Sequence, residues 1–333
     1  LLEEVARLYG YSKIIPSLPE RDLTPVKPNP ISDMSRVVIK KLTGMGMDEV
    51  LTYSFVGRDI YENTLLSIES CLEIENPISP DLSHMRNTLI PSLIAKVKDN
   101  ARYEKEFSIF EIGRRIEMEL DDEGIHIQPR VITGAIYIAD QDTVYYNAKG
   151  VVENLLSHFG VEAEYEDINE ASKHKAYAGL HPSRSAAIMH NEKLIGVVGE
   201  LHPQSQLNWG LDGRVGVFEI EFDYLLNNAA NIKKYSPLSQ YQSVERDLSF
   251  WVNKKHNYSE LLASIDDLKL AEVVNVSLQD IYEPKGEERK SITIKVTLQS
   301  DIKTLEEKEI NEIISKIIKE IELDLKAELR GKK

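Results

Sequence analysis

The 333-residue sequence predicts an α+β protein in two parts, because its length is typical of about two domains. In residues 31–230, short strand-like segments and helical segments follow one another through turns, a pattern typical of a predominantly antiparallel sheet with helices packed on it. In residues 236–333 the order is β-α-β-β-α-β. That order is typical of a split-βαβ sandwich with helices on one face of its sheet and the other face open.

The composition excludes several classes of protein. The net charge is −15, from 40 basic and 55 acidic residues, which argues against a general phosphate-neutralising surface and against DNA binding. Residues 236–333 hold 16 lysines and arginines against 19 acidic residues, so this part is nearly neutral and has room for a local basic face. No run approaches the ~20 apolar residues of a membrane span, and the sequence shows no signal-peptide pattern. We therefore expect a cytoplasmic protein without a membrane partner.

The cysteine and histidine residues predict no metal centre. A single cysteine, Cys71, excludes an internal disulfide and a thiolate-rich metal site, and it fits a reducing compartment. The eight histidines show no HExxH or other close pair. His181 and His202 each precede a proline, which favours loops at both positions.

Residues 1–15 predict the last helix of a preceding domain, ending at Gly10. The chain opens on Leu1 within an amphipathic pattern, so we expect a fragment of a longer protein. Glu3 and Glu4 lie about 100° apart on this helix and hold a hard cation only with ligands from elsewhere. A solvated face is the simpler interpretation. Residues 16–30 contain five prolines and predict a linker.

The first elements of the larger part are a helix at Ser32–Thr43 and a strand at Glu49–Val56. A proline-punctuated loop, Asn76–Thr88, follows and carries Arg86. This arginine is either part of a ligand platform or a cap on a neighbouring carbonyl, and the sequence favours the cap. A helix follows this loop and places four apolar residues on one face, namely Leu89, Leu93, Ile94 and Val97. After the helix, a strand is expected to end at Gly113.

The remaining elements of the larger part complete the predicted sheet. They are a strand at Val131–Ala139, a helix at Ala148–Gly160, a strand at Val161–Asp167, a hairpin of His181–Met189 with Leu194–His202, a strand at Val215–Phe222 and a turn at Asp223–Asn227. Arg184 lies at the start of one of these strands. It is either a site residue or a surface ion-pair partner, and surface pairing is the more common role of such a residue.

The smaller part has the clearest pattern. Its predicted elements are Val244–Val252, the helix Tyr258–Leu268, strands around Val274–Leu278 and Ile292–Leu298, the helix Leu305–Ile321 and a last strand over Leu323–Leu329. A ligand is expected on the open sheet face or at the loop Tyr282–Lys290. An aromatic ring beside lysine and arginine suits a stacked base, whereas a solvated hairpin loop explains the same residues equally well.

Ten motifs in chain order resemble one family, the β subunit of bacterial phenylalanyl-tRNA synthetase, over essentially the whole chain. The motifs are LLEEVARLYGY, GMDEVLTYSFV, ENPISPDLSHMRNTLIPSL, FSIFEIG, LHPSRSA, VGELHP, VERDLSFWV, LQDIYEPKG, RKSITIKV and TLEEKEI. The resemblance implies that residues 1–15 end a small domain. It also implies that residues 31–230 form a non-catalytic class II aminoacyl-tRNA synthetase-like module, and that residues 236–333 form a ferredoxin-like anticodon-binding domain.

The resemblance further implies partners and cofactors. In this family α and β subunits form an α2β2 tetramer that attaches phenylalanine to tRNA(Phe), with Mg²⁺, and the α subunit binds ATP. Glu3 and Glu4 match a glutamate pair assigned to a magnesium site shared with α. The aspartates that complete that site precede Leu1, so the site here is incomplete. The helix Ser32–Thr43 is similar to the interface helix of class II synthetases, whose apolar side meets a partner.

The resemblance assigns tRNA contacts to the smaller part. Tyr282 matches a tyrosine on which an anticodon base stacks, and Ser291 matches a serine that contacts the same base. Asp280 and Arg330 are weaker candidates near them, and Lys290 is a candidate for a phosphate contact.

We expect no catalytic residues in this chain. The last strand of the larger part, GVFEIEFDYLL, lacks the glycine-rich arginine motif that an adenylating site requires, and Arg86, Arg114 and Arg184 are scattered. The alternative to a ligase subunit is a stand-alone tRNA- or protein-binding relative without synthetase activity.

Overall fold

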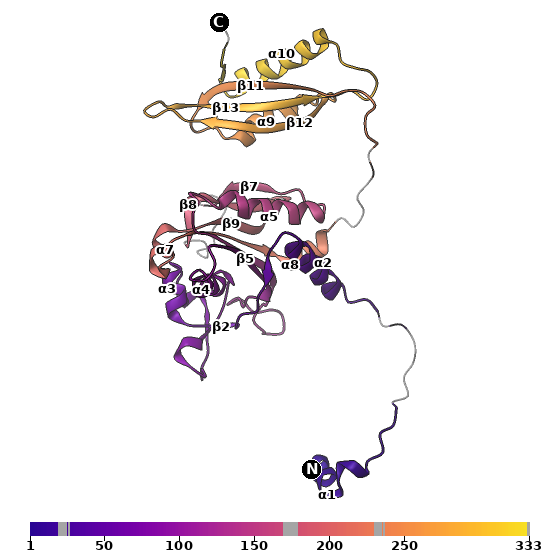
Figure 1. The fold of residues 1–333 in the computed structure, drawn as a ribbon, viewed down its shortest axis with the longest axis vertical. Helices are drawn as coiled ribbons and strands as arrows, with labels where there is room; N and C mark the ends of the chain where they lie inside the picture. Colours follow the sequence, from indigo (N-terminus) through magenta and orange to yellow (C-terminus); the bar gives the residue numbers. More distant parts are fainter. Residues whose placement is uncertain (19–24, 26, 169–178, 230–234, 236, 332–333) are drawn as a thin grey trace. The chain divides into compact units, whose positions relative to one another are not determined.

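The computed structural model describes residues 1–18, 25, 27–168, 179–229, 235 and 237–331 (Figure 1). The chain forms two compact units, Leu1–Lys233 and Lys234–Lys333. Residues 19–24 and 26 of the predicted linker at 16–30 lie outside the described residues. No helix in the described ranges is long and apolar enough to span a bilayer.

The larger unit is built on a seven-stranded sheet in the order β1-β5-β6-β10-β9-β8-β7, as predicted for an antiparallel sheet. Every neighbouring pair is antiparallel except β1 with β5. The strands are β1 (Asp48–Glu49), β5 (Glu106–Arg114), β6 (Arg130–Ile138), β7 (Glu164–Asp167), β8 (Leu180–His190), β9 (Lys193–Leu201) and β10 (Arg214–Glu221).

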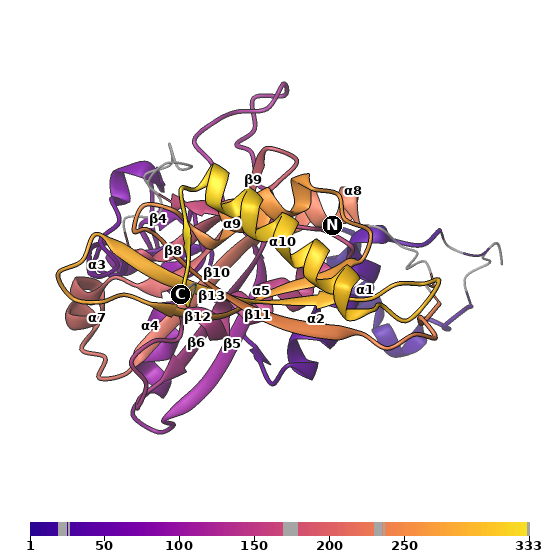
Figure 2. The same cartoon turned by 90° about the horizontal axis from the view of Figure 1, so that it is seen from above.

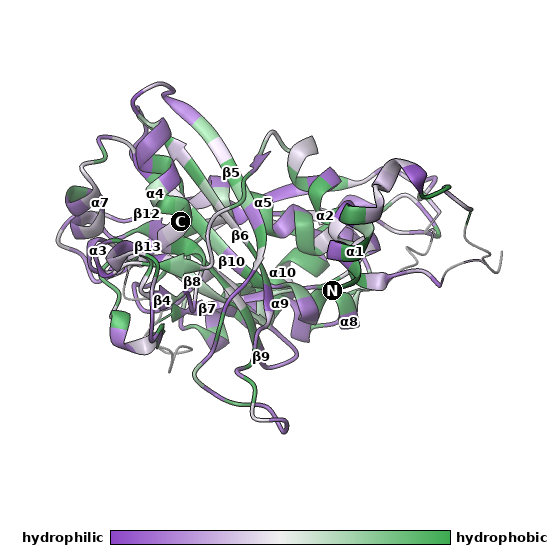
Figure 3. Ribbon diagram, turned by 90° about the horizontal axis from the view of Figure 1, so that it is seen from below, coloured by the Kyte–Doolittle hydropathy of each residue, from purple (hydrophilic) through white to green (hydrophobic). Residues whose placement is uncertain are grey.

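Helices cover both faces of this sheet. One face packs against three helices, α2 (Pro30–Gly44), α5 (Tyr145–His158) and α8 (Phe222–Asn228), which share a core with side chains of β6 and β10. The opposite face packs against α4 (Ile90–Asn100), which shares a second core with the intervening side chains of the same two strands. Successive residues of a strand point to opposite faces, so both sets of β6 side chains are buried. The central strands are therefore hydrophobic along most of their length (Figure 3).

The rest of the larger unit consists of short elements. A three-stranded sheet in the order β2-β4-β3 packs on a small core around Tyr61 and Cys71. The elements are α1 (Leu2–Tyr9), η1 (Tyr11–Lys13), β2 (Phe55–Val56), α3 (Arg58–Asn63), η2 (Ile68–Ser70), β3 (Leu72–Glu73), η3 (Pro80–Leu82), β4 (His84–Met85) and α7 (Pro203–Trp209).

A β-hairpin arm, residues 117–127, extends between β5 and β6. Its two sides are joined by backbone hydrogen bonds, from Glu117 N to Ile127 O (2.9 Å) and from Ile127 N to Glu119 O (3.0 Å). The arm exposes both carboxylates and apolar side chains. The exposed carboxylates are Glu119, Asp121, Asp122 and Glu123, and the exposed apolar residues are Met118, Leu120, Ile125 and Ile127.

A buried ion pair joins β5 to the segment after β4. Arg86 Nη2 lies 2.7 Å from Glu111 Oε1, and both side chains are at most 3% exposed. Arg86 Nε also donates a hydrogen bond to the carbonyl of Arg114 (3.2 Å). The Thr52 hydroxyl accepts a hydrogen bond from Arg86 Nη1 and donates one to Glu111 Oε2, each at 2.6 Å. The predicted carbonyl cap is present, but its arginine is fully buried and is held mainly by a carboxylate.

The smaller unit has the βαββαβ order that the sequence predicts. Its sheet has the order β12-β13-β11-β14, with all neighbours antiparallel. Both helices share one hydrophobic core with the sheet, and α10 lies across the strands in Figure 2. The elements are β11 (Val244–Asn253), α9 (Tyr258–Asp267), β12 (Val273–Tyr282), β13 (Arg289–Leu298), α10 (Glu307–Asp324) and β14 (Glu328–Leu329).

Three predicted strand or turn assignments are wrong. Glu49–Val56 is not one strand, because its two ends join different sheets and Thr52 between them bonds to Glu111. The turn at 223–227 belongs to α8, whose Phe222 and Leu225 are buried in the core. The last strand is only Glu328–Leu329, because α10 continues through Leu323.

The two histidine–proline pairs predicted as loops belong to regular elements. His181 and Pro182 lie in β8, where the pairing with β9 shifts register between Leu180 and Ser185 and so tolerates a proline. His202 caps α7, and Pro203 opens that helix.

The expectation for the apolar side of α2 is also corrected. Met34, Val38 and Leu42 are buried in the core of the chain's own module, and the last two have no exposed surface. Only Val37 on the adjoining side is substantially exposed. The apolar side of α2 therefore packs on the sheet of its own module and does not form an exposed surface for a partner.

We predict that Arg86→Met destabilises the chain by about 3–5 kcal/mol, because it leaves the Glu111 carboxylate buried without its partner. The double variant Arg86→Met/Glu111→Leu should lose much less, since it removes both charges. Chemical denaturation followed by circular dichroism measures both. A cost below about 1 kcal/mol for Arg86→Met alone contradicts the assignment.

Candidate nucleic-acid interface

The two faces of the C-terminal sheet differ in character. On β13, Ile292, Ile294 and Val296 point into the core beneath the helices. The alternate residues point to the other face, which neither helix of this unit covers, and they are polar. Among them, Thr293 Oγ1 bonds to Ser249 Oγ (2.9 Å), and Lys295 Nζ pairs with Glu245 (2.9 Å). This open face is the candidate interface.

One row of the open face carries two aromatic rings. Ser291 of β13 lies opposite Trp251 of β11 and opposite Tyr282 of β12, so the serine lies between the two aromatic residues. The ring centroids of Trp251 and Tyr282 are 6.3 Å apart, with an interplanar angle of 66°. The tyrosine ring is half exposed.

Two arginines complete this arrangement, which we call the aromatic–arginine cluster: Trp251, Tyr282, Arg289 and Arg330, around Ser291. The guanidinium carbon of Arg330 lies 5.3 Å from the Trp251 ring centroid and 5.9 Å from that of Tyr282. The guanidinium of Arg289 lies 4.7 Å from the Trp251 ring. Rings and guanidinium planes of this kind stack on nucleic-acid bases, and a guanidinium also pairs with phosphate.

The two arginines have different ion-pair partners. Arg289 donates to Glu287 (2.9 Å) and lies 3.7 Å from Glu328, and the hydrogen bond to Glu287 raises the pKa of Arg289 above its usual value. Arg330 is exposed and forms no ion pair within the described residues. Of the two arginines in the cluster, Arg330 is therefore the one whose positive charge no carboxylate of the described residues neutralises.

Ser291 is buried beneath this cluster and has an unpartnered hydroxyl. The residue is 1% exposed, and its Oγ has no hydrogen-bond partner in the structure. Asp280 lies one row further along β12, opposite Thr293, and is exposed. The structure thus brings four predicted residues to one face: Tyr282, Ser291, Asp280 and Arg330.

Lys290 is not brought to this face. The predicted loop ends earlier, because Lys290 belongs to β13, where it lies opposite Val252. It is 8% exposed and precedes Ser291, so its side chain points to the helix-covered face. Sequence reasoning placed it beside Tyr282 because it took the hairpin loop to be two residues longer.

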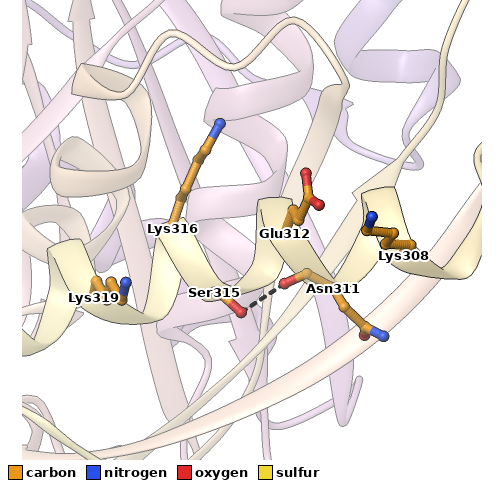
Figure 4. A pocket seen from close by; sticks show the side chains of 6 residues that line it. All are labelled: Lys308, Asn311, Glu312, Ser315, Lys316 and Lys319. Carbon is orange, nitrogen blue, oxygen red and sulfur yellow. Dashed lines mark hydrogen bonds between the residues drawn. The ribbon is translucent and has the colours of Figure 1, made fainter.

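A hollow of about 350 Å³ lies beside the cluster. Its wall includes the side of Trp251, the turn at Glu287–Glu288 and Arg289. A larger depression of about 660 Å³ lies over α10, but all of its lining side chains come from the outward surface of that one helix (Figure 4). That surface is opposite the apolar side of α10, which packs on the sheet, so it adds nothing to the open face.

The predicted magnesium ligands lie on α1, which begins after Leu1 and ends at Gly10 as expected. Glu3 and Glu4 are both exposed, and Glu4 Oε2 is paired with Arg7 at 2.7 Å. No group of three or more potential metal ligands occurs among the residues that the structure describes. The pair alone offers too few oxygens for Mg²⁺, which prefers six.

Two of the arginines singled out in the larger unit, Arg86 and Arg184, are engaged by carboxylates. Arg86 is buried against Glu111, and Arg184 lies 2.7 Å from Glu200. Glu200 also accepts hydrogen bonds from Val144 N and Tyr145 N at the start of α5. Burial opposes ionisation of this carboxyl, but the hydrogen bond from the Thr143 hydroxyl, the two backbone bonds and the charge of Arg184 together hold its pKa below the usual value. The expected ion pair of Arg184 is therefore present, but its partner is a buried carboxylate that also caps a helix.

Comparison with known families gives two adjoining matches. Residues 14–222 match the phenylalanyl-tRNA synthetase beta chain CLM domain, and residues 239–330 match the ferredoxin-fold anticodon-binding domain. The chain belongs to the phenylalanyl-tRNA synthetase β-chain family. The resemblance drawn from the sequence motifs is confirmed.

Relatives of this β-chain family align along nearly the whole chain. The phenylalanine–tRNA ligase beta subunit of Dehalococcoides mccartyi is 31% identical over 99% of this chain, and that of Carboxydothermus hydrogenoformans is 32% identical over 99%. The alignments cover 41% and 42% of those proteins, so the chain spans about two-fifths of the length of the relatives it matches. A pyrrolysyl-tRNA synthetase from Desulfitobacterium hafniense is 13% identical, with a TM-score of 0.47, over 59% of this chain and 68% of that chain.

Sequence reasoning missed two members of the cluster in this β-chain. Trp251 was treated only as part of a strand, although the alternation Leu248, Phe250, Val252 already put it on the opposite face. Arg289 was considered only as one of the charges beside Tyr282, either next to a stacked base or solvated in a loop. The pairing of β11 with β13, which no local pattern reveals, brings Trp251 opposite Ser291, which lies two residues from Arg289 on the same strand.

We predict that the chain by itself binds Mg²⁺ weakly or not detectably. Glu4 is already paired with Arg7, and two neighbouring glutamates cannot replace enough of the ion's water shell. Isothermal titration calorimetry with MgCl₂ tests this, with Glu3→Gln/Glu4→Gln as the control. A tight, stoichiometric site that this double variant abolishes contradicts the prediction.

Proposed function

We propose that this chain acts as part of a phenylalanine–tRNA ligase β subunit and binds tRNA(Phe) through the open face of its C-terminal sheet. The observation that carries the proposal is the aromatic–arginine cluster, which combines a half-exposed and a partly buried ring, an unpaired guanidinium and a buried, unpartnered hydroxyl at one face. These groups suit an unstacked base and its phosphate. The matched anticodon-binding domain lies in the same unit.

Each proposed contact residue has a separate role. Tyr282 supplies a stacking surface for a base, and Ser291 supplies a hydroxyl for a hydrogen bond to that base. Arg330 neutralises a phosphate, and Asp280 lies where it can accept a hydrogen bond from a base edge or a ribose hydroxyl. Lys290 points away from this face, so we propose Arg330 rather than Lys290 as the residue that contacts a phosphate.

The larger unit is proposed to be a scaffold without catalytic residues. We assign residues 31–230 to the non-catalytic class II synthetase-like module and residues 236–333 to the anticodon-binding domain. Arg86 and Arg184 are tied to buried carboxylates, which leaves neither to bind the phosphates of ATP. ATP and phenylalanine would be bound by an α subunit in an α2β2 tetramer in the cytoplasm. Mg²⁺ would be needed by the complete enzyme, with Glu3 and Glu4 supplying part of one site.

We predict that Tyr282→Ala weakens tRNA(Phe) binding by about 1–3 kcal/mol, the usual contribution of a base stacked on an aromatic ring. Because stacking involves no charge, the dependence of the affinity on salt concentration should stay the same. Tyr282→Phe keeps the ring and should bind like the wild type. Filter binding with the reconstituted α–β enzyme measures all three. Wild-type affinity in folded Tyr282→Ala would place the tRNA contact elsewhere on the subunit.

We also predict that Arg330→Ala lowers the slope of log K against log salt by roughly one unit, because one phosphate contact is lost. Lys295→Ala is the matched control, since this lysine lies on the same face but is already paired with Glu245. Lys290→Ala should also leave the slope unchanged. Equal slopes for Arg330→Ala and the wild type would mean that Arg330 does not contact a phosphate.

A further inference from the structure

We propose that the base site is closed by its own side chains in the free protein, and that Trp251 is both its lid and a second stacking surface. A single-stranded RNA base would enter by displacing the Trp251 ring and the Arg330 guanidinium from above Ser291. This inference rests on the proposed function and adds a residue to it that the family resemblance does not supply.

The first support is the position of the two rings. β11 and β12 lie on either side of β13, and neighbouring strands are about 4.8 Å apart, so the backbones of Trp251 and Tyr282 are separated by roughly 10 Å. Their ring centroids are only 6.3 Å apart. Both rings therefore lean toward each other over the strand between them, where Ser291 lies.

The second support is the hydroxyl beneath the rings. Ser291 Oγ is fully buried and makes no hydrogen bond, although it lies on the face that no helix covers. Buried hydroxyls are nearly always bonded, and an exception calls for a specific reason. A base edge that replaced the covering ring would provide the missing partner, whereas water cannot reach it while the rings are closed.

The third support is the position of Arg330. Its guanidinium lies against both rings, 5.3 Å from the Trp251 centroid and 5.9 Å from the Tyr282 centroid. A guanidinium is planar and stacks on aromatic faces as a base does, so it occupies the surfaces that a base would use. Arg330 has no carboxylate partner within the described residues that would hold it there. A phosphate arriving with the base would draw it away.

Tryptophan fluorescence tests the lid directly. The chain has two tryptophans, and the other, Trp209, belongs to the larger unit, where its Nε1 donates to Thr64 Oγ1 (3.2 Å). Trp209→Phe therefore leaves Trp251 as the one reporter in the whole chain. The titrant is an RNA hairpin with the anticodon stem and loop of tRNA(Phe). We expect saturable quenching of Trp251 emission, and a binding constant at least about fivefold weaker in Trp251→Val than in the wild type.

Ser291→Ala separates this inference from a purely structural role. Removing an unpartnered buried hydroxyl should leave the thermal midpoint unchanged or raise it, while RNA binding becomes weaker because the base loses its hydrogen bond. A structural serine would give the opposite pattern, with a lower midpoint and unchanged affinity. Trp251→Phe keeps an aromatic lid and should bind more tightly than Trp251→Val. This variant keeps the comparison valid if the valine variant folds poorly.

The outcomes for the lid and for the proposed function are distinct. In one outcome, RNA binds and Tyr282→Ala weakens binding, but Trp251 emission stays constant and Trp251→Val binds RNA like the wild type. The proposed lid role of Trp251 is then wrong, and the proposed tRNA-binding function is retained. If the wild-type chain does not bind the hairpin, or Tyr282→Ala binds it equally well, the proposed function of this face fails and the lid fails with it.

Discussion

The period-two alternation of β13 is the constraint on which the smaller unit depends. The same strand supplies alternate isoleucines to the core and alternate polar residues to the open face. Burial of Ile292 and Ile294 fixes the register against both neighbouring strands, and that register puts Ser291 between Trp251 and Tyr282. A slip of one residue would move Lys290 into this row and turn Ser291 into the core, while Ile292 and Ile294 would move to the open face. The hydrophobic core therefore determines the chemistry of the exposed surface, although no core residue contacts it.

In the larger unit, polar groups that resemble site residues are used for structure instead. A sheet buried on both faces leaves no surface on which exposed charges can converge, so an arginine on it must be neutralised within the protein. Arg86 is neutralised by Glu111, and Glu200 joins Arg184 to the start of α5. Arg115 is likewise surrounded by carboxylates, and burial raises the pKa of the adjoining Glu221 carboxyl even though Arg115 opposes the shift. This use of charge fits a module that supports an assembly rather than one that binds nucleotide phosphates.

The sequence predicted long periodic elements well and short or paired features poorly. The helix around Leu93 and the first three strands of the smaller unit were predicted correctly because their apolar periods extend over several turns or residues. The segment Glu49–Val56 failed because strand-forming residues alone do not determine pairing, and here tertiary contacts divide it between two sheets. For the candidate site, family motifs supplied Tyr282 and Ser291. Trp251 depends on a partner about 40 residues away in the chain, so only the sheet register shows it.

The hairpin arm at 117–127 has a consequence for how the chain meets a polyanion. It displays four exposed carboxylates on a unit that is already strongly acidic, whereas the smaller unit is nearly neutral and carries on its open face an arginine without an ion pair among the described residues. A polyanion is therefore repelled more strongly by the larger unit than by the smaller one, and its encounters with the larger unit are short-lived. The carboxylates of the arm add to this long-range repulsion, which acts on the rate of association more than on the affinity.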